Sequence, residues 1–147
     1  MNKYRFGFDF RGLLLFVLVM IPNFIWFALP APNDVLLAES ITPVIDVIGS
    51  VAQVMFIAAM CMLVRKDVEK IRFTKLIIAV FIMVILYFTG WILYYCGFVN
   101  LAVIILLTLP PCGAFIFYTV DRKNFISLIP AVIFTICHII YGVVNFI

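Results

Sequence analysis

The chain alternates between long apolar runs and short polar stretches. Five apolar runs can be read in it, at roughly 12–29, 43–64, 76–98, 99–120 and 126–147. Each run has the about 17–25 residues that a helix needs to cross a bilayer. Membrane-barrel strands do not fit these lengths, because they have about 9–11 residues and alternate polar with apolar positions. The pattern therefore predicts an all-α integral membrane protein with five transmembrane helices in one bundle.

The connections between these runs are short, so we expect a single membrane domain over residues 1–147. The longest connection, PAPNDVLLAESIT, begins with two prolines that stop a helix, and its Val35-Leu36-Leu37 is expected to lie back against the bilayer or the bundle. The 97–100 turn leaves so little room that the third and fourth helices must form an antiparallel hairpin. The first run exceeds the about 7–15 residues of a signal-peptide core, and we expect a retained helix.

Composition supports a membrane protein and argues against an enzyme. The chain is 67% hydrophobic and 12% charged, whereas soluble domains have about 25% charged residues. It has no H-E-x-x-H, no G-x-S-x-G and no phosphate-binding glycine loop. We therefore expect no catalytic activity and no cofactor. The four cysteines form no C-x-x-C pair, so they are predicted to be free apolar thiols rather than metal ligands or disulfides.

The basic residues predict the orientation of the bundle. Because successive helices cross in opposite directions, all ten Lys and Arg residues fall on one side: Lys3, Arg5, Arg11, Arg65, Lys66, Lys70, Arg72, Lys75, Arg122 and Lys123. The positive-inside rule places the N-terminus and these loops in the cytoplasm, and the 30–42 loop and the C-terminus outside the cell membrane. The net charge is +3, and we expect these basic residues to contact lipid phosphates rather than nucleic acid.

One face of the second run is polar where contact with lipid would be expected. Asp46, Ser50 and Gln53 occur at i, i+4 and i+7, so they share one stripe over two turns. One interpretation makes Asp46 a first-turn anion, with Thr42 as N-cap and Pro43 at the first helical position. The other places the stripe in the bundle interior or a watery cavity, because an Asp at the centre of a span costs about 2.5–3.5 kcal/mol on insertion scales.

The fifth run carries a similar polar face. Thr135, His138, Gly142 and Asn145 fall at i, i+3, i+7 and i+10. His138 is the only histidine of the chain. It is interpreted either as a neutral ring that donates a hydrogen bond across a helix interface, or as the partner of Asp46 in a titratable couple.

Aromatic and proline residues complete the candidate region. Trp26, Tyr94 and Tyr95 are typical of interfacial belts, which do not explain Asn23. Pro22, Pro110 and Pro111 are expected to kink or break the first and fourth helices, because each removes a backbone donor. Such breaks either serve packing or line a binding cavity.

These observations predict a small-molecule binding site on the outward-facing side of the bundle. The expected ligand-binding residues are Asn23, Asp46, Gln53, Trp91, Tyr94, His138 and Tyr141. A carboxylate among aromatic rings suits a cationic or amphipathic molecule or a cation, which the protein would bind and could transport. The alternative is a non-catalytic accessory or structural subunit, whose polar stripes bind partner helices of another subunit or of a second copy.

Five spans in a chain of this length resemble the tryptophan-rich sensory and translocator proteins, which bind porphyrins and sterols. The Trp- and Pro-rich loop after the first span of that family has no counterpart in PAPNDVLLAESIT. Neither the ligands nor the binding residues of that family are therefore carried over to this sequence.

Overall fold

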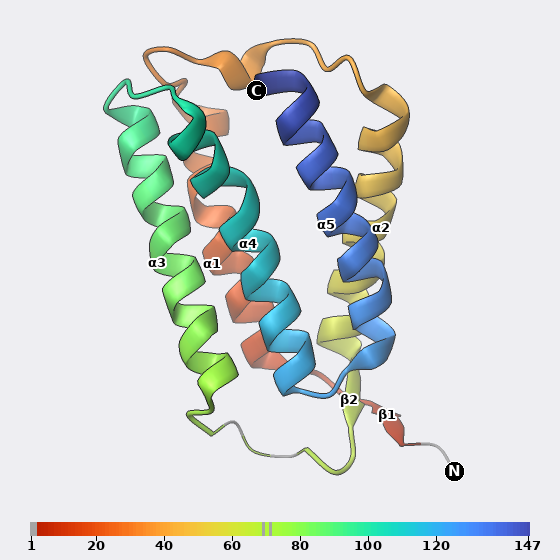
Figure 1. The fold of residues 1–147 in the computed structure, drawn as a ribbon. Coiled ribbons are helices and arrows are strands. Elements are labelled where there is room, and N and C mark those ends of the chain that lie inside the picture. Colours follow the sequence, from red (N-terminus) through yellow and green to blue (C-terminus); the bar gives the residue numbers. More distant parts are fainter. Residues whose placement is uncertain (1–2, 69, 71) are drawn as a thin grey trace.

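Five long helices make up most of the chain. The computed structural model describes residues 3–68, 70 and 72–147. The helices are α1 (Phe10–Ala28), α2 (Pro43–Met62), α3 (Lys75–Tyr95), α4 (Leu101–Asp121) and α5 (Phe125–Phe146) (Figure 1). A short 3-10 turn, η1 (Val35–Leu37), interrupts the loop between α1 and α2. All five helices are long and apolar enough to cross a membrane, which confirms the five helices expected and is compatible with a multi-pass membrane protein.

A small sheet departs from the all-α expectation. Strand β1 (Tyr4–Phe6) pairs antiparallel with β2 (Leu63–Arg65), at residues predicted to end the second helix. The backbone N–H of Asp9 donates to the carbonyl of Cys61 at 2.7 Å, and that of Gly7 donates to Met62 at 3.1 Å. The last carbonyls of a helix have no donor within it. The segment before α1 supplies these donors, so α2 stops at Met62.

The helices pack as two antiparallel pairs that α4 and α5 join. α3 lies along α4, as the short turn between them predicts, and α2 lies along α5 (Figure 1). α1 packs against α2, α3 and α4 but makes fewer contacts than these pairs do. The central core includes Phe56, whose ring centroid lies 5.0 Å from that of Phe115 and 5.3 Å from that of Phe134.

Glycines allow two close helix contacts. A Cβ atom on Gly90 of α3 would lie 2.7 Å from Cβ of Leu106 and 3.1 Å from its backbone carbon. A Cβ atom on Gly142 of α5 would lie 2.9 Å from Oγ1 of Thr108. Small residues of this kind let helix backbones approach in membrane proteins. α4 therefore contacts α3 and α5 at positions where no side chain would fit.

Of the kink or break expected at the prolines, the break does not occur. α1 continues through Pro22, and α4 continues through Pro110 and Pro111. Each proline removes only its own donor, and the hydrogen bonds of neighbouring turns hold the helix on both sides. All three prolines are buried, so packing holds their segments in place.

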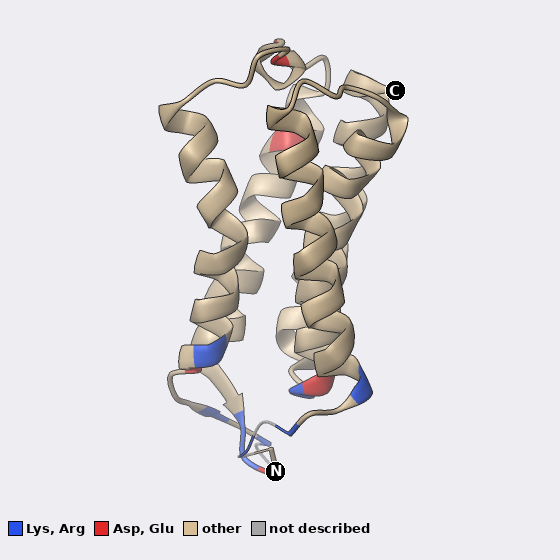
Figure 2. Cartoon of the chain, turned by 90° about the vertical axis from the view of Figure 1, so that its left-hand side faces the viewer, with Lys and Arg blue, Asp and Glu red and all other residues tan. Residues whose placement is uncertain are grey.

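Charge divides the bundle into two different ends. All ten Lys and Arg residues lie where α1, α3 and α5 begin, as Figure 2 shows. We call this the basic end. The opposite end carries the C-terminus and the acidic residues Asp34, Glu39 and Asp46 (Figures 1 and 2). The gathering of the basic residues, predicted from alternating helix directions, is confirmed.

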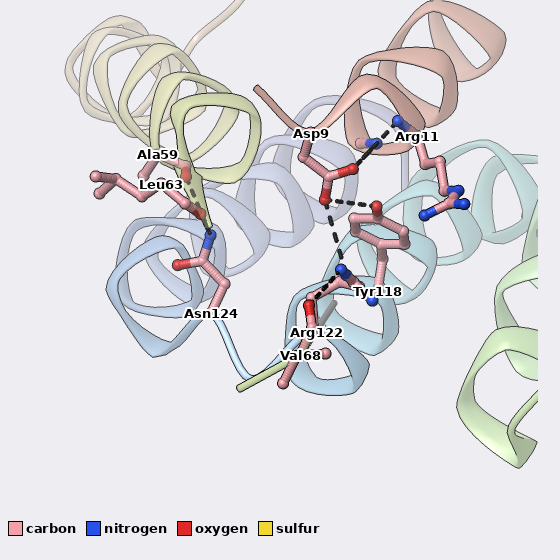
Figure 3. A network of polar contacts seen from close by, with 9 residues as sticks. Asp9, Arg11, Ala59, Leu63, Val68, Tyr118, Arg122 and Asn124 are labelled. Carbon is pink, nitrogen blue, oxygen red and sulfur yellow. Dashed lines mark hydrogen bonds and ion pairs between the residues drawn. The ribbon is translucent and has the colours of Figure 1, made fainter. Parts of the chain in front are cut away.

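A network of hydrogen bonds ties four helices together at the basic end (Figure 3). Asp9 caps α1 by accepting from the backbone N–H groups of Arg11 and Gly12 at 3.1 and 3.2 Å. Its other carboxylate oxygen accepts from the hydroxyl of Tyr118 on α4 at 2.8 Å.

Asn124 forms the second half of this network. It caps α5 by accepting from the N–H of Ser127, and its amide donates to the carbonyls of Ala59 and Leu63 at 3.0 and 2.9 Å (Figure 3). The residue is only 3% exposed. One side chain thus starts α5 and satisfies the C-terminal carbonyls of α2.

Candidate functional site

A cavity of about 420 Å³ lies inside the bundle, and all five helices contribute to it. We call it the larger cavity, to distinguish it from a smaller one that adjoins it. α1 and α2 form most of two walls, and α5 forms a third. Among the predicted ligand-binding residues, it is lined by Asn23, Asp46, Gln53, His138 and Tyr141. The structure therefore brings together polar side chains that the sequence places on three separate helices.

Asp46 satisfies parts of both interpretations made from the sequence. Thr42 stands at the N-cap position and Pro43 at the start of α2, which places Asp46 in the first turn. The Thr42 hydroxyl makes no capping bond to the backbone; it donates to the Asp46 carboxylate at 3.0 Å. A carboxylate is favoured at this helix end. The same carboxylate also lines the larger cavity.

His138 keeps its hydrogen-bonding capacity for the cavity. Its ring makes no hydrogen bond with the described part of the chain, so the interhelical bond expected of a structural histidine is not formed. The ring stacks between Phe134 and Tyr141 of its own helix, with centroid distances of 5.2 and 6.4 Å. Neutral imidazole carries one donor and one acceptor. Both of these are available to a molecule in the cavity.

Asp46 and His138 line the same space without touching. Neither a hydrogen bond nor an ion pair joins them, although both residues lie within the described ranges. The titratable couple that the sequence suggested is therefore not a direct contact. A molecule in the cavity could contact both side chains at once.

A smaller cavity of about 150 Å³ adjoins the larger one. The two share Asn23, Tyr87, His138 and Tyr141, and Trp91 lines only the smaller one. The amide of Asn23 donates to the Tyr87 hydroxyl at 2.8 Å. The indole N–H of Trp91 is buried and has no acceptor among the described residues. A buried donor without an acceptor is costly, so this position favours a molecule that carries an acceptor oxygen.

Tyr94 lies outside both cavities, unlike the other predicted ligand-binding residues. Its side chain is fully buried, and its hydroxyl donates to the Asp34 carboxylate at 2.7 Å. Asp34 also accepts from the indole N–H of Trp26, at 2.8 Å to one oxygen. Trp26 and Tyr94, which the sequence suggested as belt residues, thus hold the 30–42 loop on α1 and α3.

The polar face expected on α5 divides between several tasks. His138 lines the cavities, whereas Thr135 donates to the carbonyl of Ala131 in its own helix. Asn145 accepts from the backbone N–H of Ile41 and donates to the Thr42 hydroxyl, at 2.8 and 3.0 Å. The end of this face therefore holds the start of α2 in place and does not contribute to the cavity.

Sequence reasoning missed two residues that shape this region. Tyr87 lines both cavities and lies four positions before Trp91 on α3. That spacing places the two rings on one helix face, and it was a usable signal. Asp34 gave no such signal, because it lies in a loop, and its donors Trp26 and Tyr94 lie on two different helices.

The described residues offer no site for a metal ion of the usual kind. No three His, Cys, Asp or Glu side chains gather within that part of the chain. The thiols of Cys61, Cys96, Cys112 and Cys137 are free and lie in or beside four different helices. The chemistry at hand is therefore one carboxylate, one imidazole and several amide and hydroxyl groups within aromatic walls.

No protein-family model, no curated protein and no solved structure matches this chain. The resemblance in span number to the tryptophan-rich sensory and translocator proteins gains no support from these comparisons. The site must be interpreted from its own geometry and chemistry.

Proposed function

We propose that this chain is a multi-pass protein of the cell membrane that binds a small cationic or amphipathic molecule, or a cation, in the larger cavity. The basic end faces the cytoplasm in this proposal, following the positive-inside rule. The cavity then lies on the path between the bilayer centre and the outside.

The observation that carries this proposal is the composition of the cavity wall. Among the described residues, Asp46 is the only acidic one that lines it, and no Lys or Arg does. Aromatic rings from several helices form much of the remaining surface: Phe16, Phe27, Tyr87, Phe115, Phe134 and Tyr141. One negative charge within such walls attracts a cation through both charge and cation–π interactions. A few polar groups in a mostly apolar pocket are also typical of small-molecule sites.

The position of the opening favours an amphipathic ligand. Exposed residues of two helices, Phe27 of α1 and Ser50 of α2, lie on the cavity's rim. In a bilayer this rim would face lipid, so a molecule that partitions into the membrane could enter between α1 and α2. Transport would need a second state that opens toward the basic end.

The alternative function, an accessory subunit, rests on the same opening. A helix of a partner protein could fill the space between α1 and α2 and satisfy Ser50 and Gln53. Purification from the native membrane under mild conditions separates the two functions. Co-purification of a second protein in equal amount supports the accessory subunit. Purification of this chain alone, with a melting temperature that added ligand raises, supports ligand binding.

Tetraphenylphosphonium, a lipophilic cation, tests the proposal directly. We expect it to raise the melting temperature of the purified protein, and tetraphenylborate, an anion of similar shape, to have no such effect. Asp46→Asn should abolish the stabilisation. Glu39→Gln removes one negative charge from an exposed residue at the same end and should retain it. Equal stabilisation by both ions, or loss in both variants, would contradict a cation site at Asp46.

A further inference from the structure

A second hollow lies at the basic end, far from the cavities near Asp46. Its volume is about 380 Å³, and it lies where the segment before α1 meets β2 and the end of α4. Its polar lining comes from Arg5, Asp9, Arg11 and Arg122. The exposed rings of Phe8 and Phe10 belong to the same hollow.

The charge in this hollow is not balanced. Among the residues that the structure describes, three guanidinium groups line it beside a single carboxylate, that of Asp9. Asp9 already accepts from two backbone N–H groups and from Tyr118. Within the described ranges, Arg5 and Arg11 form no ion pair. The hollow thus presents positive charge that the protein itself leaves largely uncompensated.

Arg122 is only partly satisfied by its contacts within the protein. Its side chain is only 9% exposed, its Nη2 donates to the carbonyl of Val68 at 2.9 Å, and its Nε lies 3.9 Å from Asp9 (Figure 3). Its Nη1 is buried without a partner in the described part of the chain. Taking a charged group out of water is costly unless an opposite charge accompanies it. An anion in the hollow would add that charge beside Asp9.

An apolar lane leads away from the hollow along α1. Phe10, Leu14, Val17 and Ile21 are all exposed, by 68%, 58%, 42% and 38%. Their spacing places them on one side of the helix, directed from the basic end toward the middle of the bundle. Positive charge at one end of an apolar lane matches the shape of a lipid with a charged headgroup.

We propose that the hollow is a binding site for an anionic phospholipid. The phosphate lies among Arg5, Arg11 and Arg122, and an acyl chain follows the lane on α1. Arginine suits this task because its planar fork can donate two parallel hydrogen bonds to phosphate oxygens. This site is independent of the cavity near Asp46 and holds even if that cavity binds nothing.

Other basic residues at the same end are less suited to bind the phosphate. Arg65 donates to Asp67 at 2.6 Å, and this hydrogen bond holds the pKa of the Asp67 carboxyl below its usual range. The positive charge of Arg65 is therefore already paired with a carboxylate. Lys66 and Arg72 are exposed and do not line the hollow, so they provide matched controls for removal of charge.

Native mass spectrometry of the delipidated protein in detergent can test the site. Phosphatidylglycerol and phosphatidylcholine with identical chains are added, and the retained lipid is measured. We expect one phosphatidylglycerol to bind at least tenfold more tightly than phosphatidylcholine. Because a basic side chain near a charged lipid contributes about 1 kcal/mol, Arg5→Gln with Arg11→Gln should weaken binding roughly 10- to 30-fold. Lys66→Gln with Arg72→Gln should change it less than threefold.

Two further experiments test the proposal. Arg122→Lys keeps the charge but loses the planar fork, and it should weaken binding if the protein still melts as the wild type does. Inorganic phosphate and glycerol 3-phosphate should not compete at millimolar concentration, because neither fills the apolar lane. Equal retention of phosphatidylcholine, equal loss in the Lys66 and Arg72 control, or full competition by soluble phosphate would each overturn the proposal.

Discussion

The hydroxyl of Tyr94 donates a hydrogen bond of 2.7 Å to the carboxylate of Asp34, although 60 positions separate the two residues. The same hydroxyl accepts from the backbone N–H of Leu36 at 3.2 Å. Asp34 in turn binds the indole of Trp26 on α1. The 30–42 loop is therefore fixed to α1 and α3, beside the smaller cavity that Trp26 and Leu36 help to line.

Removing the Tyr94 hydroxyl should destabilise this end of the bundle. Tyr94→Phe removes one of the donors to Asp34, which keeps the Trp26 indole, and leaves the Leu36 N–H without its acceptor. Hydrogen bonds to charged groups contribute about 1.5–3 kcal/mol. We expect the free energy of unfolding in mixed micelles to fall by about 2 kcal/mol. Tyr95→Phe is the matched control, because Tyr95 donates only to the neutral carbonyl of Leu29 in an exposed place. An equal effect of the two changes would contradict a special role for Asp34.

Asn124 should contribute more to the free energy of unfolding than an ordinary helix cap does. Asn124→Ala removes the cap of α5 together with two partly buried bonds to the C-terminal end of α2, at Ala59 and Leu63. We therefore expect a loss of about 2–4 kcal/mol in the free energy of unfolding. Asn100 caps α4 through one bond to Val103 and is exposed. Asn100→Ala should cost about 1 kcal/mol. The difference between these variants measures the bond between α2 and α5, and no difference would refute it.

Gly90 should tolerate no side chain, whereas Gly113 should. In Gly90→Ala the added methyl meets Leu106, including its backbone, and overpacking of this kind costs about 1–3 kcal/mol. In Gly113→Ala the nearest atom is the thioether sulfur of Met83, at the far end of a flexible side chain. The higher helix propensity of Ala should then leave stability unchanged or raised by up to about 1 kcal/mol. Thermal unfolding of both variants checks the contrast.

The apolar pattern predicted the helices well because length and hydrophobicity are local properties. α2 could not be ended correctly from the sequence, since its final carbonyls bond to Gly7 and Asp9, more than fifty positions away. Whether a proline breaks a helix likewise depends on packing as well as on local sequence. Pro110 and Pro111 remove local donors, yet packing keeps α4 continuous around them.

The candidate site was predictable to a similar degree. Helical spacing placed Asp46 and Gln53 on one face, and both line the larger cavity. The spacing could not show that only one of Trp91 and Tyr94 lines a cavity, because the two residues are three positions apart on the same helix. Trp91 lines the smaller cavity, whereas the Tyr94 hydroxyl donates to Asp34. Nor could it show that Asp46 and His138 stay apart, which depends on the distance between α2 and α5.

Cys96 offers a native reporter of orientation. It is exposed at the end opposite the basic residues, whereas Cys61, Cys112 and Cys137 are buried. An impermeant maleimide added to intact cells should therefore label the wild type and not Cys96→Ser. In that background, Glu39→Cys should restore labelling and Lys66→Cys should not, since both positions are exposed but at opposite ends. Labelling at position 66 without permeabilisation would reverse the proposed orientation.

Asp46 and His138 should act independently until a ligand joins them. In the ligand-free protein they share no hydrogen bond or ion pair, so the effects of Asp46→Asn and His138→Gln on thermal unfolding should add within about 0.5 kcal/mol. With tetraphenylphosphonium bound in the cavity, each change alone should weaken binding, and the double variant should lose less than the sum of the two. Non-additivity would then arise only from the bound molecule that contacts both residues. Additive losses of binding would contradict a ligand that couples the two residues, and coupling in the ligand-free protein would contradict their independence.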